Sequence, residues 1–130
     1  MKKIAVLLLL FGLTSCLGWG DMFATNSWED GPYYVTDEAA GCPSLYIEIN
    51  SGAGHGRVSC LTAIGSNQTH IIAKTSEGMT QYWILDKRKD RPALNSDEIV
   101  EGPYSYNEFV NRKKKLKIKQ LKFTHRWKKN

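Results

Sequence analysis

The 130-residue sequence has only three cysteines and four prolines, and its longest apolar run, residues 4–11, has eight residues. A membrane-spanning helix needs about 20 apolar residues, so this run is too short to cross a bilayer. The sequence also has no Cys-x-x-Cys pair, no His-x-x-x-His pair and no nucleophile-elbow motif. Because these are common local signatures of zinc sites and hydrolases, we expect no metal, no cofactor and no enzymatic activity.

The N-terminal end has the features of an export signal. Lys2 and Lys3 precede the apolar run, and residues 13–16 (LTSC) follow at the distance where a signal peptide is cut. This tetrapeptide resembles the lipobox of bacterial lipoproteins, which implies that residues 1–15 are removed and that Cys16 carries a diacylglyceride. Two acyl chains anchor a protein stably, at about 0.8 kcal/mol per buried methylene. The alternative is an ordinary secretory signal with an unrelated cysteine.

The residues after Cys16 indicate a location and a tether. Leu17 lacks the acidic character that retains lipoproteins in the inner membrane of enteric-type bacteria. In such a cell we therefore expect the outer membrane, with the protein facing the periplasm or the exterior. Residues 16–30 have no hydrophobic period and predict a tether that reaches on the order of 20 Å. Trp28 fits a tether less well and is expected to dock on a single small domain, residues 31–130.

Short β-forming segments separated by turn residues fill the middle of the chain. They are residues 33–36 (YYVT), 45–49 (LYIEI), 57–64 (RVSCLTAI), 70–74 (HIIAK) and 81–86 (QYWILD). No gap between them holds a crossover helix, so the pattern predicts an α+β fold with an antiparallel sheet of five or six short strands. Residues 87–97 predict a loop, and residues 99–100 predict a short strand that the Gly102-Pro103 pair ends.

One helix is expected near the C-terminus. Ser105 and Glu108 have the spacing of a capping box, which predicts a helix over about 106–114. Residues 116–124 are predicted as a strand or extended segment, because Leu116 and Ile118, and then Leu121 and Phe123, alternate with polar residues. The break in phase at residue 120 predicts a bulge or kink between the two halves.

Four segments together carry a family resemblance. They are residues 70–74 (HIIAK), 82–87 (YWILDK), 102–109 (GPYSYNEF) and 121–123 (LKF). In this order they resemble a family of small bacterial lipoproteins known only as a domain of unknown function. The resemblance implies a fold class and an envelope location, but it implies no activity. The sequence departs from the family pattern in a longer insert over 87–101 and in its last four residues.

Cys42 and Cys60 are the cysteines left beside Cys16, and they lie 18 residues apart. Export to an oxidising compartment favours a disulfide, which would contribute about 3 kcal/mol by restricting the unfolded chain. Two unpaired cysteines are the alternative. A zinc site formed with His55 and His70 is disfavoured, because no closely spaced ligand pair sets its geometry.

The glycine-rich segment 52–57 (GAGHGR) looks like a phosphate-binding loop, but a strand is expected to follow it. A phosphate-binding loop needs a helix N-terminus behind its N–H groups. We therefore predict a mobile hairpin loop here, with a binding loop as the alternative, because exposed glycine-rich tips do sometimes bind ligands.

Acidic residues are absent from residues 112–130, which carry ten lysines and arginines, whereas residues 16–111 carry 13 acidic and 6 basic ones. The net charges of +10 and −7 describe an acidic body with a basic end. The favoured interpretation is structural: the apolar residues pack, and the lysines protect a sheet edge from aggregation. The alternative is contact with anionic lipid, through Lys113, Lys114, Lys115, Lys128 and Lys129. We expect no nucleic-acid partner, because an exported lipoprotein seldom meets nucleic acid.

These observations favour a lipid-anchored, non-catalytic envelope protein that serves as a structural or interaction module for a protein partner. The second hypothesis is an inhibitor or immunity protein against an exported toxin or hydrolase. An acidic body of small size suits that role, because complementary charge speeds association with a basic enzyme. An enzyme is the third and weakest hypothesis, because no catalytic motif supports it.

Overall fold

The computed structural model describes residues 26–37, 41–50 and 52–128. The expected signal peptide, Cys16, most of the expected tether and Lys129 lie outside these residues. In the described residues the chain forms nine strands and two helices: β1 (Trp28–Asp30), β2 (Tyr33–Thr36), β3 (Ser44–Asn50), β4 (Ala53–Val58), β5 (Leu61–Ser66), β6 (His70–Thr75), β7 (Gln81–Asp86), α2 (Ser96–Ile99), β8 (Val100–Tyr104), α3 (Tyr106–Lys115) and β9 (His125–Arg126).

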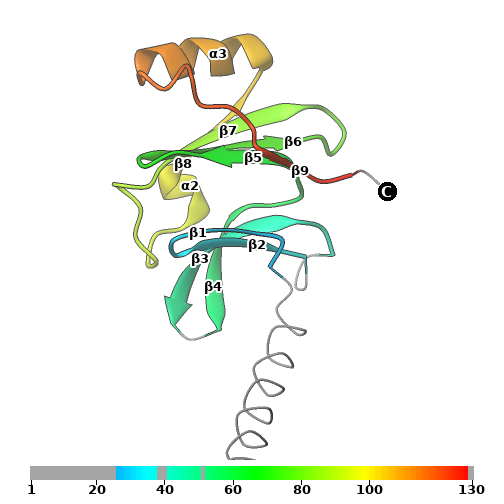
Figure 1. The fold of residues 1–130 in the computed structure, drawn as a ribbon, viewed down its shortest axis with the longest axis vertical. Helices are drawn as coiled ribbons and strands as arrows, with labels where there is room; N and C mark the ends of the chain where they lie inside the picture. Colours follow the sequence, from blue (N-terminus) through cyan, green and yellow to red (C-terminus); the bar gives the residue numbers. More distant parts are fainter. Residues whose placement is uncertain (1–25, 38–40, 51, 129–130) are drawn as a thin grey trace, which may run out of the picture.

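The strands form two antiparallel sheets that face one another (Figure 1). The first sheet has the order β1-β2-β3-β4, and the second has the order β8-β7-β6-β5-β9. The expected α+β class, with mainly antiparallel strands and a helix near the C-terminus, is confirmed. The strands are more numerous than the five or six expected, and they are divided between two sheets.

The division between the sheets falls inside residues 57–64, which were predicted as one strand. β4 ends at Val58, β5 begins at Leu61, and Cys60 between them has a φ of 56°. This left-handed conformation is uncommon for a residue with a side chain, and it redirects the chain from the first sheet to the second. The prediction was wrong because the apolar residues on both sides of Cys60 face the same core, so their pattern hides the turn.

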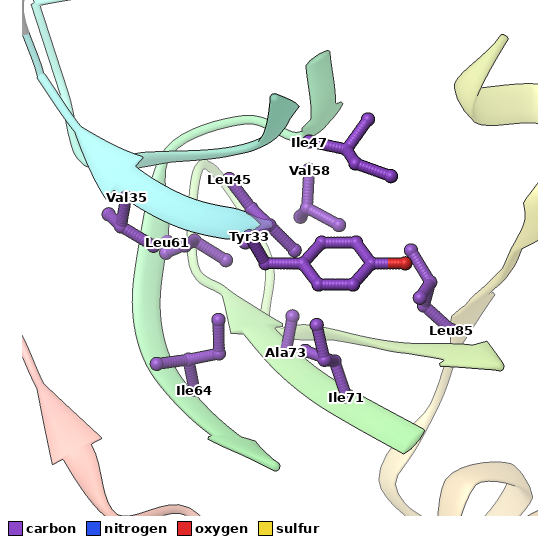
Figure 2. Close-up of a cluster of buried hydrophobic side chains, with 10 residues drawn as sticks. All are labelled: Tyr33, Val35, Leu45, Ile47, Val58, Leu61, Ile64, Ile71, Ala73 and Leu85. Carbon is purple, nitrogen blue, oxygen red and sulfur yellow. The ribbon is translucent and has the colours of Figure 1, made fainter. Parts of the chain in front are cut away.

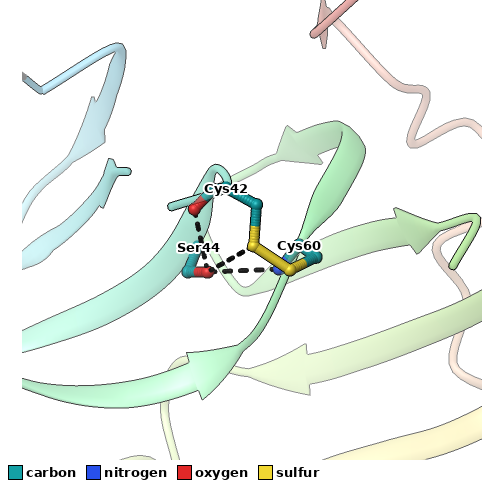
Figure 3. The surroundings of a disulfide bond; sticks show 3 residues. All are labelled: Cys42, Ser44 and Cys60. Atoms are coloured by element: carbon teal, nitrogen blue, oxygen red, sulfur yellow. Dashed lines mark hydrogen bonds between the residues drawn. A yellow bond between two sulfur atoms is a disulfide. The ribbon is translucent and has the colours of Figure 1, made fainter. Parts of the chain in front are cut away.

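A disulfide joins Cys42, just before β3, to Cys60 at this turn (Figure 3). The two Cα atoms are 5.0 Å apart, so the pairing expected from export is confirmed. The Ser44 hydroxyl supports it by donating to the Cys42 carbonyl at 3.2 Å and accepting from the Cys60 N–H at 3.1 Å. The crosslink therefore holds the passage between the sheets against the start of β3.

The main core lies between the sheets and comes from strands of both. Its buried residues are Tyr33, Val35, Leu45, Ile47, Val58, Leu61, Ile64, Ile71, Ala73 and Leu85 (Figure 2). Tyr33 and Val35, two residues apart on β2, both point into this core, as strand alternation requires. Burying a side chain of this size contributes about 1.5–3 kcal/mol, so this cluster is the main source of stability.

Helix α3 and the chain that follows it cover the other face of the second sheet (Figure 1). The helix begins at the expected capping box, where Ser105 N–H donates to Glu108 Oε1 at 2.8 Å and the Glu108 N–H donates to Ser105 Oγ at 3.3 Å. A second core forms beneath it from Ile72, Ile84, Phe109, Ile118 and Leu121. The predicted helix is therefore confirmed, and it ends at Lys115.

The strand or extended segment predicted over 116–124 forms no strand, whereas the break predicted at residue 120 coincides with a turn at residues 119–120. Leu116 and Lys117 form a turn, and Lys117 has a φ of 60°. A second turn brings the Leu121 N–H to the Ile118 carbonyl at 3.0 Å, so both side chains are buried three residues apart. Strand pairing begins only at β9, which is antiparallel to β5. The alternation of apolar residues did not predict these turns, because apolar residues spaced by two and three can also pack on the second core from consecutive turns.

Gly65 allows the C-terminal segment to cross β5 closely. A Cβ atom at this position would overlap the Lys122 carbonyl oxygen, so only glycine fits beneath the crossing chain. The Thr124 N–H then donates to the Ile64 carbonyl at 2.9 Å. The C-terminal segment is thus part of the fold, and not an appended tail.

Three boundaries also differ from those predicted. The first strand begins at Trp28, inside the expected tether, because Trp28 pairs with Val35 and packs on the core. The expected loop is shorter, because Ser96–Ile99 forms α2. The Gly102-Pro103 pair does not end a strand but lies within β8, whose register with β7 shifts between Tyr82 and Ile84.

Candidate functional site

The outer face of the first sheet carries a row of residues in direct register across all four strands. Glu29 of β1 lies opposite Tyr34 of β2, Tyr34 lies opposite Tyr46 of β3, and Tyr46 lies opposite Gly56 of β4. Neighbouring residues on β2 and β3 face the core, so strand alternation directs these side chains away from it. This face points away from the second sheet (Figure 1).

The two tyrosines of this row stack on one another. Their ring centroids are 5.6 Å apart and their planes differ by 22°. Gly54 allows this arrangement, because a Cβ atom there would overlap the Tyr34 hydroxyl. At Gly56 a Cβ atom would meet nothing within 4 Å, so the sheet face beside Tyr46 is open. Gly54 thus makes room for the Tyr34 hydroxyl, and Gly56 leaves the sheet beside Tyr46 uncovered.

A groove of about 550 Å³ lies over this face. We call it the tyrosine groove and define it by six of its lining residues: Asn26, Glu29, Tyr34, Tyr46, Glu48 and Gly54. Pockets of this size are within the range that binds small molecules or anchoring side chains of a partner. Residues of β1, β2, β3 and β4 all contribute to its lining.

The electrostatic character of the tyrosine groove is acidic. Glu29 and Glu48 are exposed, and within the described residues neither forms an ion pair. The Asn26 amide donates to Glu29 Oε1 at 2.8 Å. Burial raises the pKa of Tyr34 above its ordinary value, and the neighbouring Tyr46 and Glu48 raise it further. The phenol therefore stays neutral near neutral pH, and the carboxylates set the sign of the potential.

A buried ion pair holds β4 beneath the groove. Arg57 Nη2 and Nε each lie 2.9 Å from an oxygen of Asp90, and neither side chain is exposed to solvent. The Tyr33 hydroxyl donates to Asp90 Oδ2 at 2.9 Å. Burial and this carboxylate raise the pKa of Tyr33 far above its ordinary value. The network joins β2, β4 and the loop after β7 at one end of the molecule.

The glycine-rich segment 52–57 is therefore not the mobile hairpin loop that we predicted. Ala53–Val58 forms β4, and His55 Nδ1 lies 2.9 Å from the Pro92 carbonyl oxygen. The segment pairs because glycines with no side chains still complete backbone hydrogen bonds, and Arg57 fastens its end. Its binding role stays a prediction, since Gly52, Ala53 and Gly54 line the tyrosine groove.

His70 and the cysteines do not assemble into the zinc site considered from the sequence. The sulfurs of Cys42 and Cys60 are bonded to each other. His70 is buried, its Nδ1 lies 2.7 Å from Thr69 Oγ1, and its Nε2 lies 3.7 Å from Asp86 Oδ2. Burial lowers the pKa of His70, so its neutral form is favoured in the fold. In the part of the chain described, no three potential metal ligands gather.

The lysines of the basic end differ in whether they contact the rest of the fold or are exposed to solvent. Lys113 donates to the Leu121 carbonyl at 2.7 Å and lies 5.1 Å from the centroid of the Phe109 ring. Burial lowers its pKa, and Lys122 adds to this effect. Lys114, Lys115 and Lys128 are exposed, so their predicted contact with anionic lipid stays a prediction. Lys113 is poorly placed for contact with lipid, because its ammonium group already binds the chain that follows α3.

Neither Tyr34 nor Tyr46 was singled out from the sequence, although both lie in segments predicted as strands. The available signal was that each tyrosine falls on the outward position of a half-buried strand, where polar residues are usual. Within residues 26–37, 41–50 and 52–128, no helix is long and apolar enough to cross a membrane. Comparisons with family models, curated proteins and solved structures find no match to this chain, so its function is argued from the groove itself.

Proposed function

We propose that this chain is a lipid-anchored, non-catalytic protein of the bacterial envelope that binds a protein partner through the tyrosine groove. The observation that carries the proposal is the stacked pair Tyr34 and Tyr46 on an exposed sheet face, flanked by carboxylates. Tyrosine is enriched in protein interfaces, because its rigid ring gives a large contact area at low cost in conformational entropy. A stacked pair is already ordered before the partner arrives.

The chemistry of the groove favours binding over catalysis. Its described lining residues include carboxylates, phenols and an amide, but no histidine, cysteine, lysine or arginine. A nucleophile with a general base beside it is the usual minimum for acyl or phosphoryl transfer. His70 is buried on the second sheet, where solvent hardly reaches it. The groove thus offers an aromatic contact surface and negative charge, which suit the binding of a protein partner.

The expected anchor would keep the groove close to a membrane. Asn26 lines the groove, and only nine residues, 17–25, separate it from Cys16, the expected site of lipid attachment. If the tether predicted from the sequence behaves as a random coil, its root-mean-square span to Asn26 is about 17 Å. A partner that is itself membrane-bound, or that lies against the membrane surface, would therefore be within reach.

The anchor is tested by labelling cells with an alkyne analogue of palmitate. The wild-type chain is expected to incorporate the label and to enter the detergent phase, because a thioether diacylglyceride on Cys16 is retained there. Cys16→Ser should lose both properties. A wild-type protein that is exported but never labelled would contradict the anchor and leave an ordinary secreted domain.

The partner site is tested by a photo-crosslinking residue at Ala53, which lines the groove and is exposed. In intact cells we expect a discrete crosslinked species from this position. A matched probe at Met79, which is 66% exposed on the β6–β7 turn, should not give it. Replacing both Tyr34 and Tyr46 by threonine should remove the species while the strands are kept. The same product from both probe positions, or one that survives the threonine variant, would contradict the proposal.

The second candidate, an inhibitor or immunity protein, is favoured by the acidic groove. Exported nucleases and other toxins often present basic surfaces, and opposite charge speeds their capture. The same crosslinking experiment separates the candidates, because an inhibitor should be found attached to an enzyme whose activity it blocks. A partner without such activity favours the interaction module.

A further inference from the structure

We infer that the tyrosine groove recognises a cationic side chain, arginine or lysine, on an exposed segment of the partner protein. This inference rests on the proposed function, because it names the chemistry of the partner at the same site. It is carried by the juxtaposition of two exposed carboxylates, Glu29 and Glu48, with the faces of a stacked tyrosine pair.

The charges on this face call for a cation from outside the chain. Glu29 and Glu48 line one groove, and the described residues place no lysine or arginine in its lining. Basic residues near the first sheet are already engaged: Lys87 pairs with Asp30 at 2.7 Å, and Arg57 is buried against Asp90. Among the described residues, the first sheet and the loop after β7 therefore place no lysine or arginine in the groove to neutralise it.

The aromatic pair suits the same ligand. A guanidinium or ammonium group is attracted to the face of a tyrosine ring, and guanidinium also stacks on it. The register places Tyr34 directly between Glu29 and Tyr46, and it places Glu48 opposite Gly54. A cation seated over the rings would thus have a carboxylate on the β1 side and another on the β3–β4 side.

The sheet beside the groove admits an extended segment next to that cation. Gly56 lies opposite Tyr46, and a Cβ atom there would meet nothing within 4 Å, so the sheet surface is open at this glycine. A peptide backbone can approach a glycine surface more closely than any other. An anionic ligand would be repelled by both carboxylates, and an aliphatic one would supply no counter-charge to them.

The test uses the mature chain with Cys16→Ser, which keeps every described residue, and NMR titration with two synthetic peptides. The first is acetyl-Gly-Arg-Gly-Arg-Gly-amide, and the second is the same peptide with glutamine at both arginine positions. We expect the arginine peptide to shift the amide signals of Tyr34, Tyr46 and Gly54, and the glutamine peptide to bind at least ten-fold more weakly. Raising the salt from 50 to 500 mM should weaken the first and leave the second unchanged.

Variants assign the binding to the carboxylates. Glu29→Gln combined with Glu48→Gln should weaken the arginine peptide about five- to ten-fold, whereas the control Glu77→Gln combined with Asp97→Asn, two exposed carboxylates outside the groove, should not. Equal affinity for both peptides would overturn the inference. So would binding of the N-acetylglucosamine trimer at these residues without the arginine peptide, which would make the groove a sugar site.

Two further outcomes keep this inference separate from the proposed function. If the Ala53 crosslink persists in the double glutamine variant, the partner is real but is not held through a cation, and only the inference fails. If no crosslink forms from Ala53, the proposed function fails, and the inference that rests on it fails as well. A dimer seen in sedimentation that the double glutamine variant abolishes would assign the groove to the basic end of a second copy, and would also overturn the inference.

Discussion

Replacing Asp90 by alanine is expected to lower the free energy of unfolding by about 3–5 kcal/mol. The change leaves the Arg57 guanidinium buried without its counter-charge, at a site where neither side chain is exposed to solvent. It also removes the acceptor of the Tyr33 hydroxyl, which lies in the main core. Urea unfolding of the mature Cys16→Ser chain, followed by tryptophan fluorescence with the disulfide intact, measures the loss.

Two controls separate the buried charge from the mere loss of a side chain. Glu77→Ala removes an exposed carboxylate and should change the free energy of unfolding by less than about 0.5 kcal/mol. Asp90→Leu combined with Arg57→Met replaces the pair by apolar groups and should cost less than Asp90→Ala alone. A loss below about 1 kcal/mol for Asp90→Ala would mean that the pair does not hold β4 to the loop after β7.

Ending the chain after Lys115 is expected to unfold the domain at 25 °C. The truncation removes the buried side chains of Ile118 and Leu121 together with β9, and it uncovers Phe109. Each buried side chain of this size contributes about 1.5–3 kcal/mol, while a whole domain is stable by only about 5–15 kcal/mol. Loss of the cooperative thermal transition and of dispersed amide signals is the expected measurement.

The matched control ends the chain after Trp127, which keeps β9 and the hydrogen bond from Trp127 Nε1 to Ser27 Oγ. This shorter deletion should leave the melting temperature unchanged. Lys114→Gln combined with Lys115→Gln should also leave it nearly unchanged, because exposed charges contribute little. A chain ending at Lys115 that melts cooperatively at the wild-type temperature would show that the C-terminal segment is dispensable.

Local features of this protein were predictable because short-range interactions determine them. Helix α3 begins at Ser105 because the hydroxyl and the Glu108 carboxylate bond to backbone groups only three residues away. Strands β2, β6 and β7 were found from runs of β-forming residues, whose alternation depends on neighbours along the chain. The disulfide between Cys42 and Cys60 was predictable because only these two cysteines remain once Cys16 is assigned to the lipid, and because the expected compartment is oxidising.

Only the tertiary structure decided how these pieces combine, because the deciding contacts join residues far apart in the chain. The left-handed turn at Cys60 divides one apolar run between two sheets, since both halves can face the same core. Turns follow α3 in place of the expected strand, because the Lys113 ammonium binds the Leu121 carbonyl and Ile118 and Leu121 pack in the second core. The groove depends on a register that aligns Tyr34 with Tyr46, and strand register is set by pairing across the sheet, which no single segment encodes.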